Sequence, residues 1–190
     1  MLVRSLSLAA LLVGLAAFAL AQTTPPANPP ETFVAKARAE NERGGAIEGP
    51  IQVHLDRYTP DYDRTAVENG LKYNGFPGFV AALRKAPDVG YVELDGQKTA
   101  IRWARQAPSG AGRTIVVVTD KPVFFLGGGR SGAKPRAGYD VALVQLQVDA
   151  AGSGSGTMAG AARVKPGGAT GVQVDNYADV PVKLLSVTRQ

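Results

Sequence analysis

The sequence predicts an α+β protein: an antiparallel β-meander of about eight strands, a curved sheet or barrel-like, with a short helical pair inserted after the first strand. Three observations favour this fold. Short stretches of alternating apolar and polar residues recur through residues 44–190. The turns between them are too short for the crossovers of a parallel sheet. Residues 61–85 have instead the pattern of two short helices.

The first 21 residues have the pattern of a secretory signal peptide. Arg4 supplies a positive charge, an apolar stretch covers residues 5–20, and Ala19-Leu20-Ala21 offers small residues for cleavage. The apolar stretch is shorter than the roughly 20 residues that a membrane span requires. We therefore expect a periplasmic or secreted protein with no membrane span after cleavage.

Residues 22–43 are expected to form a Pro/Ala-rich, disordered linker. Residues 23–30 are rich in proline, which lacks an N–H and disfavours both helix and strand ladder. Residues 31–43 contain alanine and charged residues, and a short helix there would have too thin an apolar face to bury. Residues 44–190 are then a single β-rich globular domain.

The composition excludes several classes of protein. The chain has no cysteine and one histidine, so we expect no disulfide, no metal site and no lipid on a cysteine. No cofactor motif is present. The net charge of +5 comes from Lys and Arg that are scattered along the chain. We therefore expect a solvated surface and no nucleic-acid partner.

Residues 47–58 alternate as a half-buried strand does. The apolar set is Ile51, Val53 and Leu55, and the polar set is Gln52, His54 and Asp56. The only histidine of the chain therefore lies on the polar face of the first predicted strand.

The helical pair follows that strand. Asp61 and Asp63 are candidate N-caps of a first helix that ends near Leu71. Pro77 suits the first turn of a second helix. Phe79, Val80 and Leu83 share one face of this second helix, so we expect the pair to cover a sheet.

The remaining strands are separated by turn residues. Asp95-Gly96 predicts a tight hairpin, followed by a strand with Ile101 and Trp103 on one face. Residues 114–119 are apolar on both faces, so this strand should be covered on both sides. It is expected to form a central hairpin with residues 123–126. Further strands are expected over residues 139–149, 157–164, 172–177 and 180–188, with Ala142, Val144, Leu146 and Val148 pointing inward.

A glycine-rich loop is the first candidate ligand site. Gly127-x-Gly129-x-x-Gly132 has the spacing of a dinucleotide fingerprint, but Pro135 and Gly138 prevent the helix that such a site needs. We interpret residues 127–138 as a surface loop. Loops of this length are often functional. Its cations Arg130, Lys134 and Arg136 are candidate anion- or partner-binding residues.

His54 and Asp56 are the candidate catalytic residues. An imidazole positioned by a carboxylate is the arrangement that a Ser-His-Asp hydrolase uses. However, residues i and i+2 lie side by side on any strand, so the spacing favours an ordinary strand histidine that is exposed or hydrogen-bonded.

The aromatic residues of the predicted strands leave two interpretations open. Trp103, Phe125 and Tyr139 would usually belong to the core. If the sheet curls into a barrel, they would instead line an apolar pocket. The small residues of the predicted strand at 157–164 would leave room for such a cavity or would allow close packing.

The chain also resembles a known group of proteins. The stretches concerned are Ala104-Arg105-Gln106, Gly112-Arg113, Thr119-Asp120-Lys121-Pro122, residues 139–149, Val174-Asp175-Asn176-Tyr177 and Pro181-Val182. With these residues the chain is similar to a group of uncharacterised exported bacterial proteins. The resemblance implies no activity and no catalytic residue.

The expected function is therefore general. We expect an exported, non-enzymatic domain that binds a small apolar ligand or a cell-envelope partner. One alternative is a hydrolase that uses His54 with Asp56. A structural or assembly protein is the other alternative.

Overall fold

The structure is a computed structural model that describes residues 29–40, 45–124, 136–178 and 181–190. These residues form antiparallel strands and one kinked helix, which confirms the predicted antiparallel, barrel-like meander. In chain order the elements are β1 (Glu31–Glu40), β2 (Ala46–Leu55), α1 (Asp61–Leu83), β3 (Gly90–Leu94), β4 (Gln97–Ser109), β5 (Gly112–Thr119), β6 (Val141–Val148), β7 (Gly154–Pro166), β8 (Val172–Tyr177) and β9 (Val182–Arg189).

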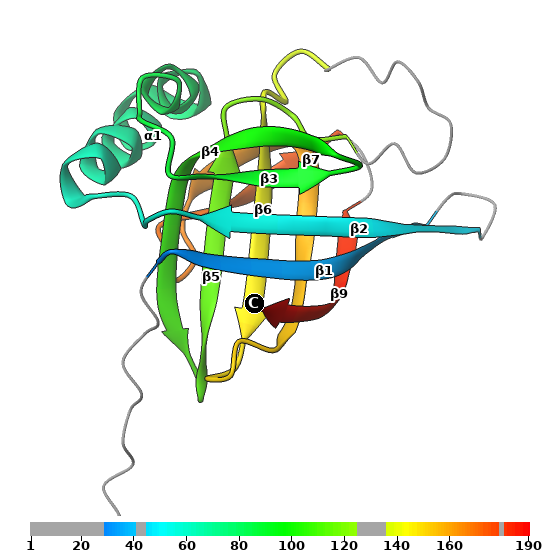
Figure 1. Ribbon diagram of the computed structural model, residues 1–190. Coiled ribbons are helices and arrows are strands. Elements are labelled where there is room, and N and C mark those ends of the chain that lie inside the picture. The colour runs from blue at the N-terminus through cyan, green and yellow to red at the C-terminus, as the bar shows by residue number, and fades with distance from the viewer. Residues whose placement is uncertain (1–28, 41–44, 125–135, 179–180) are drawn as a thin grey trace, which may run out of the picture.

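Eight of these strands close into a barrel. Each of β1 to β6 pairs with its neighbours in the sheet, β6 also pairs with β7, β7 pairs with β9, and β9 returns to β1 (Figure 1). From β1 to β7, strands that follow one another in the chain are also neighbours in the sheet, and α1 lies between β2 and β3. The barrel is therefore a simple meander interrupted by one helix. Among the described strands, β8 pairs with β7 alone and stands outside the barrel.

The interior of the barrel is filled by apolar side chains. Alternate residues of each strand point inward, including the predicted set on β6. The interior cluster contains, among others, Phe33, Ile51, Leu55, Val92, Ile115, Val117, Leu146, Met158 and Leu184. These side chains occupy the space in which a larger barrel would hold a ligand.

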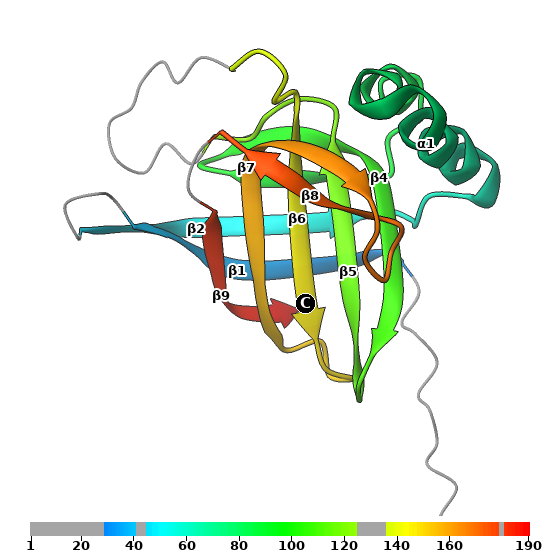
Figure 2. The same ribbon diagram turned by 180° about the vertical axis from the view of Figure 1, so that it is seen from behind.

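The outer side of the barrel has two different walls. We define the covered wall as the outer side of β4, β5, β6 and β7. Here Val116 and Val118 of β5 pack in one cluster with Val67 and Phe79 of α1. The second half of β7 and β8 cross over the same wall (Figure 2). The prediction that this strand is covered on both faces is therefore confirmed.

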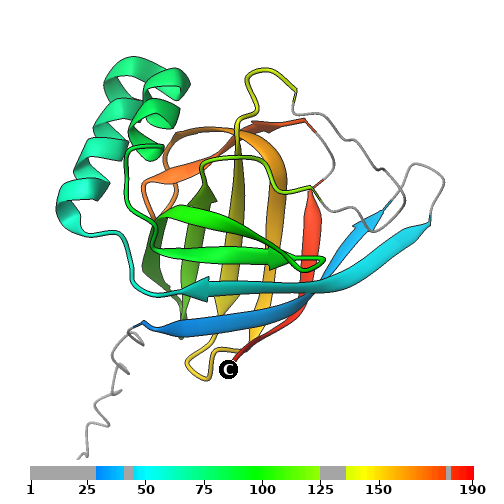
Figure 3. The ribbon, with the colours of Figure 1, turned by 45° about the horizontal axis from the view of Figure 1, so that its top comes forward.

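We define the open wall as the outer side of β1, β2 and β3. No helix among the described residues lies over it, as the view from above also shows (Figure 3). Along β3 buried residues alternate with half-buried ones. The open wall therefore presents one polar surface of the barrel to the solvent.

The helix α1 consists of two helical arms joined at Gly75, whose φ is 63°. Pro77 lies just beyond this kink, and Phe79, Val80 and Leu83 are buried as predicted. The prediction for the start of the helix was wrong in detail. Pro60 occupies the N-cap position, and Asp61 and Asp63 lie in the first turn without capping it.

Three further predictions need correction. Residues 31–40 form β1, where a linker or short helix was expected, so the helix follows the second strand and not the first. Val123 and Phe124 are not in a strand, and residues 125–126 lie outside the described part of the chain. Ile101 and Trp103 do not share a face, because the β4–β5 register shifts between them. Ile101 points into the barrel and Trp103 lies on the covered wall.

Candidate functional site

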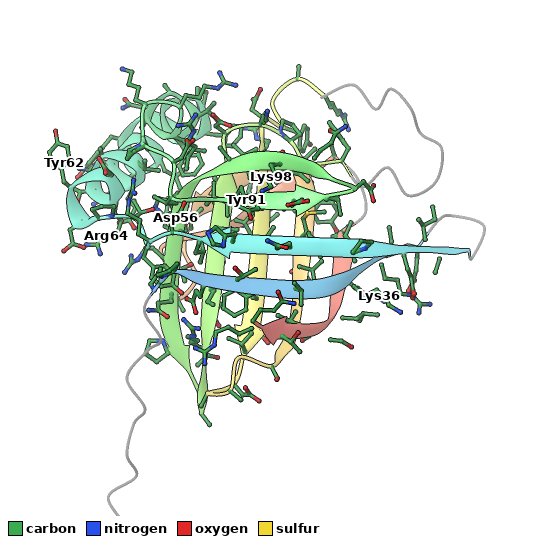
Figure 4. All side chains as sticks on the ribbon, viewed as in Figure 1. Lys36, Asp56, Tyr62, Arg64, Tyr91 and Lys98 are labelled. Atoms are coloured by element: carbon green, nitrogen blue, oxygen red, sulfur yellow. The ribbon has the colours of Figure 1, made fainter. Side chains whose placement is uncertain are left out.

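His54 lies at the centre of a polar cluster on the open wall. The β1–β2 register pairs His54 with Thr32, and the β2–β3 register pairs it with Tyr91. Directly paired residues point to the same side of an antiparallel sheet, so three strands bring these side chains together. Tyr91 and Lys98 lie on the face of the barrel that is turned toward the viewer in Figure 4.

The contacts of the imidazole define its tautomer. His54 Nε2 is 3.2 Å from Asp56 Oδ1, and His54 Nδ1 is 2.8 Å from Thr32 Oγ1. Because an ionised carboxylate only accepts hydrogen bonds, Nε2 carries the proton. In the neutral imidazole, Nδ1 then accepts the proton of the Thr32 hydroxyl. The result is a hydroxyl, an imidazole and a carboxylate in line, which is the order of groups in a catalytic triad.

Such an active site also needs donors that stabilise the oxyanion, and the surroundings of Thr32 are those of a strand paired on both sides. β1 is paired on both sides, and the backbone oxygen of Thr32 accepts a hydrogen bond from Gln190 N at 2.9 Å. Backbone groups of β1 therefore take part in two strand ladders, whereas an active site of this kind needs N–H donors that are aimed at the oxyanion. One such donor is typically worth a factor of about 100 to 1,000 in rate. Asp56 is also 60 % exposed, so water competes for its carboxylate.

Tyr91 connects the cluster to β4. Its ring stacks on His54 with 5.0 Å between ring centroids, and the Lys98 ammonium lies 4.0 Å from the ring centroid. Gln52 Nε2 donates to the Tyr91 hydroxyl at 3.1 Å. The hydrogen bond between Lys98 and Tyr91 raises the pKa of Lys98 above its ordinary value. Side chains from four strands, β1, β2, β3 and the start of β4, thus form one ordered row that crosses the open wall and ends at its border.

A surface hollow of about 510 Å3 lies further along β1 and β2. In the β1–β2 register the pair Val34 and Gln52 lies two residues along from the pair Thr32 and His54, and Val34 is the residue of β1 at which the hollow begins. The hollow is lined by Val34, Ala35, Lys36, Glu48, Gly49, Pro50 and Ser186. It forms where a β-bulge shifts the β1–β9 register between Val34 and Lys36.

Ser186 and the charged residues give the hollow its chemistry. Ser186 has a φ of 51°, in the left-handed region, which costs a non-glycine residue about 1 to 3 kcal/mol. Lys36 Nζ lies 3.4 Å from Glu48 Oε2, and Arg38 Nη1 lies 3.4 Å from Glu48 Oε1. The glutamate therefore has two cationic partners. The other lining residues are small or apolar.

The most buried polar network lies elsewhere, between β1 and β5. Arg113 binds Glu31 with two hydrogen bonds, of 2.6 Å and 3.0 Å, and both side chains are buried. The Tyr58 hydroxyl donates to Glu31 Oε1 at 2.6 Å, and Arg113 also donates to Gln106 Oε1 at 2.6 Å. Burial, followed by the hydrogen bond to Glu31, raises the pKa of Tyr58 well above its ordinary value. These groups satisfy one another, so we assign the network a structural role.

Of the predicted ligand-binding residues, Trp103, Arg136 and Tyr139 lie in the described part of the chain. Trp103 is fully buried on the covered wall under α1, away from the barrel interior. The guanidinium of Arg136 lies 5.4 Å from the ring centroid of Tyr139. Phe125, Arg130 and Lys134 lie outside the described residues, so the glycine-rich loop stays a prediction.

Sequence reasoning found His54 and Asp56 but missed Thr32 and Ser186. The alternation of β1 could have placed Thr32 on an outer face, had residues 31–40 been interpreted as a strand. Its partner on β2 depends on a register that local pattern does not contain. A positive φ at a serine has no signal in the sequence.

Comparison of the chain with protein-family models, curated proteins and solved structures gave no match. Within the described ranges, no three metal-binding side chains come together. No described helix combines the length and the apolar character needed to cross a membrane. The site must therefore be interpreted from its own chemistry.

Proposed function

We propose that this protein is an exported, non-enzymatic binding domain that recognises a cell-envelope partner through its open wall. The observation that carries the proposal is the ordered row of Thr32, His54, Tyr91 and Lys98 beside a hollow on the uncovered side of the barrel. The pattern of the first 21 residues supports export.

The open wall suits a partner better than the barrel interior does. Apolar side chains fill the interior, so a small apolar ligand would have to displace packed core residues. On the open wall, pairing across strands already holds the polar and aromatic groups in place. Binding therefore requires little further ordering of side chains.

The test is sedimentation of the exported protein with the envelope fraction of its own bacterium. The wall variant His54→Ser/Tyr91→Ser removes the centre of the row. The control variant Tyr62→Ser/Tyr73→Ser alters two tyrosines of α1 that are 86 % and 69 % exposed. We expect the wall variant to bind about tenfold more weakly and the control to bind as the unaltered protein does. Equal binding of all three proteins, or a loss confined to the control, would contradict the proposal.

A hydrolase is the second candidate, favoured by the line of Thr32, His54 and Asp56. Thr32 Oγ1 would attack the acyl carbon of an ester while His54 Nδ1 takes the hydroxyl proton; the ester C–O bond then breaks, the alcohol leaves with that proton, and water releases the acid from Thr32. The test is hydrolysis of p-nitrophenyl esters. If this activity is real, His54→Ala should lower it about 100-fold or more, as expected for loss of a general base. Hydrolysis that is unchanged in both Thr32→Ala and His54→Ala would eliminate this candidate.

Assembly through an exposed strand edge is less well supported. β8 is the terminal strand of the sheet. Arg163 and Val164 of β7 pair with Asn176 and Val174 of β8, so Asp175 between them forms a β-bulge. Asn176 Oδ1 accepts the N–H of Tyr177 at 2.8 Å. A bulge, a charged residue and a capped N–H are features that block pairing with another chain.

A further inference from the structure

We infer that the hollow beside the open wall binds the free C-terminal carboxylate of a partner polypeptide whose last residues are small and apolar. This inference rests on the proposed function, because the hollow continues the same wall, and it specifies the chemistry of the partner. Three observations carry it: the charges at the rim, the conformation of Ser186 and the apolar floor.

Lys36, one of the residues that line the hollow, can exchange its present partner Glu48 for a carboxylate of a ligand. Lys36 is 60 % exposed and forms an ion pair with one oxygen of Glu48. The other oxygen of Glu48 is held by Arg38. An exposed pair of this kind contributes little to stability, so opening it requires little free energy. An incoming carboxylate can therefore take Lys36 while Glu48 remains paired with Arg38.

Ser186 lines the same hollow and has a strained backbone conformation. Its left-handed backbone is one that glycine adopts without strain, whereas serine does not. Strained residues of this kind cluster at ligand sites, and β-bulges are enriched beside them. The exposed hydroxyl of Ser186 can donate a hydrogen bond to the carboxylate that Lys36 attracts.

The floor and the size of the hollow indicate what carries the carboxylate. Val34, Ala35 and Pro50 contribute apolar side chains to the lining of the hollow. The volume of about 510 Å3 lies in the range of sites for ligands larger than a single small acid. Two residues of an extended chain span about 7 Å. A peptide anchored in the hollow would thus reach Gln52 and then His54 along β1 and β2.

The experiment is an NMR titration of the isotope-labelled, exported protein with three probes. These are acetyl-Ala-Ala-Val with a free carboxylate, the same peptide as its C-terminal amide, and octanoate. We expect the acid to shift the amide resonances of Ala35, Lys36 and Ser186. The amide and octanoate should each bind about tenfold more weakly. Absence of these shifts overturns the inference, as does equal binding of the amide. Equal binding of octanoate overturns the assignment to a polypeptide.

Two variants and a matched control test the roles of the side chains. Lys36→Gln should weaken binding of the acid about tenfold. Lys183→Gln is the control, because Lys183 is 61 % exposed, also pairs with a glutamate, and does not line the hollow. Ser186→Gly should weaken binding and at the same time raise the midpoint of urea unfolding. Weaker binding by Lys183→Gln to the same degree, or unchanged binding by Ser186→Gly, would overturn the inference.

The two proposals can fail separately. If the peptide acid binds in the hollow but the His54→Ser/Tyr91→Ser variant still sediments with the envelope, the hollow is a site and the open wall is not the envelope-binding surface. If that variant loses envelope binding and the acid causes no shifts, the open wall binds a partner that does not insert a C-terminus.

Discussion

The covered wall and the open wall belong to the same closed barrel but differ in what lies outside them. On the covered wall, every residue of β5 from Arg113 to Thr119 is buried, because α1 and the β7–β8 pair cover its outer face. On the open wall, β3 buries only alternate residues. Burial of apolar area is the main source of stability. The comparison indicates that stability is concentrated in the covered wall, whereas the exposed polar groups of the candidate site lie on the open wall.

Trp103 and Tyr91 test this comparison with the largest expected effect. Trp103 is fully buried under α1, so Trp103→Ala should lower the free energy of unfolding by about 3 to 5 kcal/mol. Tyr91 makes cross-strand contacts on a solvated face, so Tyr91→Ala should lower it by about 1 kcal/mol or less. Trp103 is the only tryptophan, so Trp103→Ala has no tryptophan fluorescence to follow. Urea unfolding of both variants is therefore followed by circular dichroism. Equal losses would remove the distinction between the walls.

The Glu31–Arg113 pair joins the two walls, and its loss should have the next largest effect. Glu31 begins β1 and Arg113 lies in β5, with both side chains buried. Glu31→Gln removes the negative charge that forms two hydrogen bonds with the buried guanidinium, so we expect a loss of about 3 kcal/mol in the free energy of unfolding. The double variant Glu31→Leu/Arg113→Met should recover most of it, because neither charge then remains buried. If the double variant is less stable than Glu31→Gln, the loss does not come from the unbalanced buried charge, and this explanation of the pair is wrong.

Tyr58 gives the same network a pH dependence in the alkaline range. Burial and the hydrogen bond to Glu31 raise its pKa in the folded state, while in the unfolded chain it ionises near its ordinary value of about 10. Its contribution is therefore complete below pH 10 and is lost above it, by about 1.4 kcal/mol per pH unit. Tyr58→Phe should lack this decline when unfolding is measured between pH 9 and about pH 11. Tyr62→Phe, on the exposed face of α1, should keep it.

The sequence predicts the parts of both walls that depend on local alternation. The inward residues of β2 and β6, the double burial of β5 and the Asp95-Gly96 turn all follow from neighbouring residues. Trp103 was placed on the wrong face because a β-bulge reverses the alternation, and a bulge depends on the partner strand.

The strand β1 was missed for a different physical reason. Its inward residues after Phe33 are alanines, which fill little space and are better helix formers than strand formers. Pairing with β2 and β9 overrides that preference, and β9 lies at the other end of the chain. The Thr32–His54 contact and the Glu31–Arg113 pair both depend on this strand. Local reasoning therefore found only part of the candidate site.

The β3–β4 turn provides the prediction with the smallest effect. Asp95 and Gly96 have φ values of 50° and 75°, the left-handed conformations that a two-residue hairpin turn requires. Asp95→Ala should lower the free energy of unfolding by about 1 kcal/mol, because alanine tolerates this conformation poorly. Gln97→Ala, outside the turn, is the control. If the turn at the end of the open wall is independent of the covered wall, Trp103 fluorescence in the native state should be the same in both variants. A shifted emission maximum in Asp95→Ala would mean that strain at this turn is transmitted to the packing beneath α1, and the two walls would then have to be treated as one coupled unit.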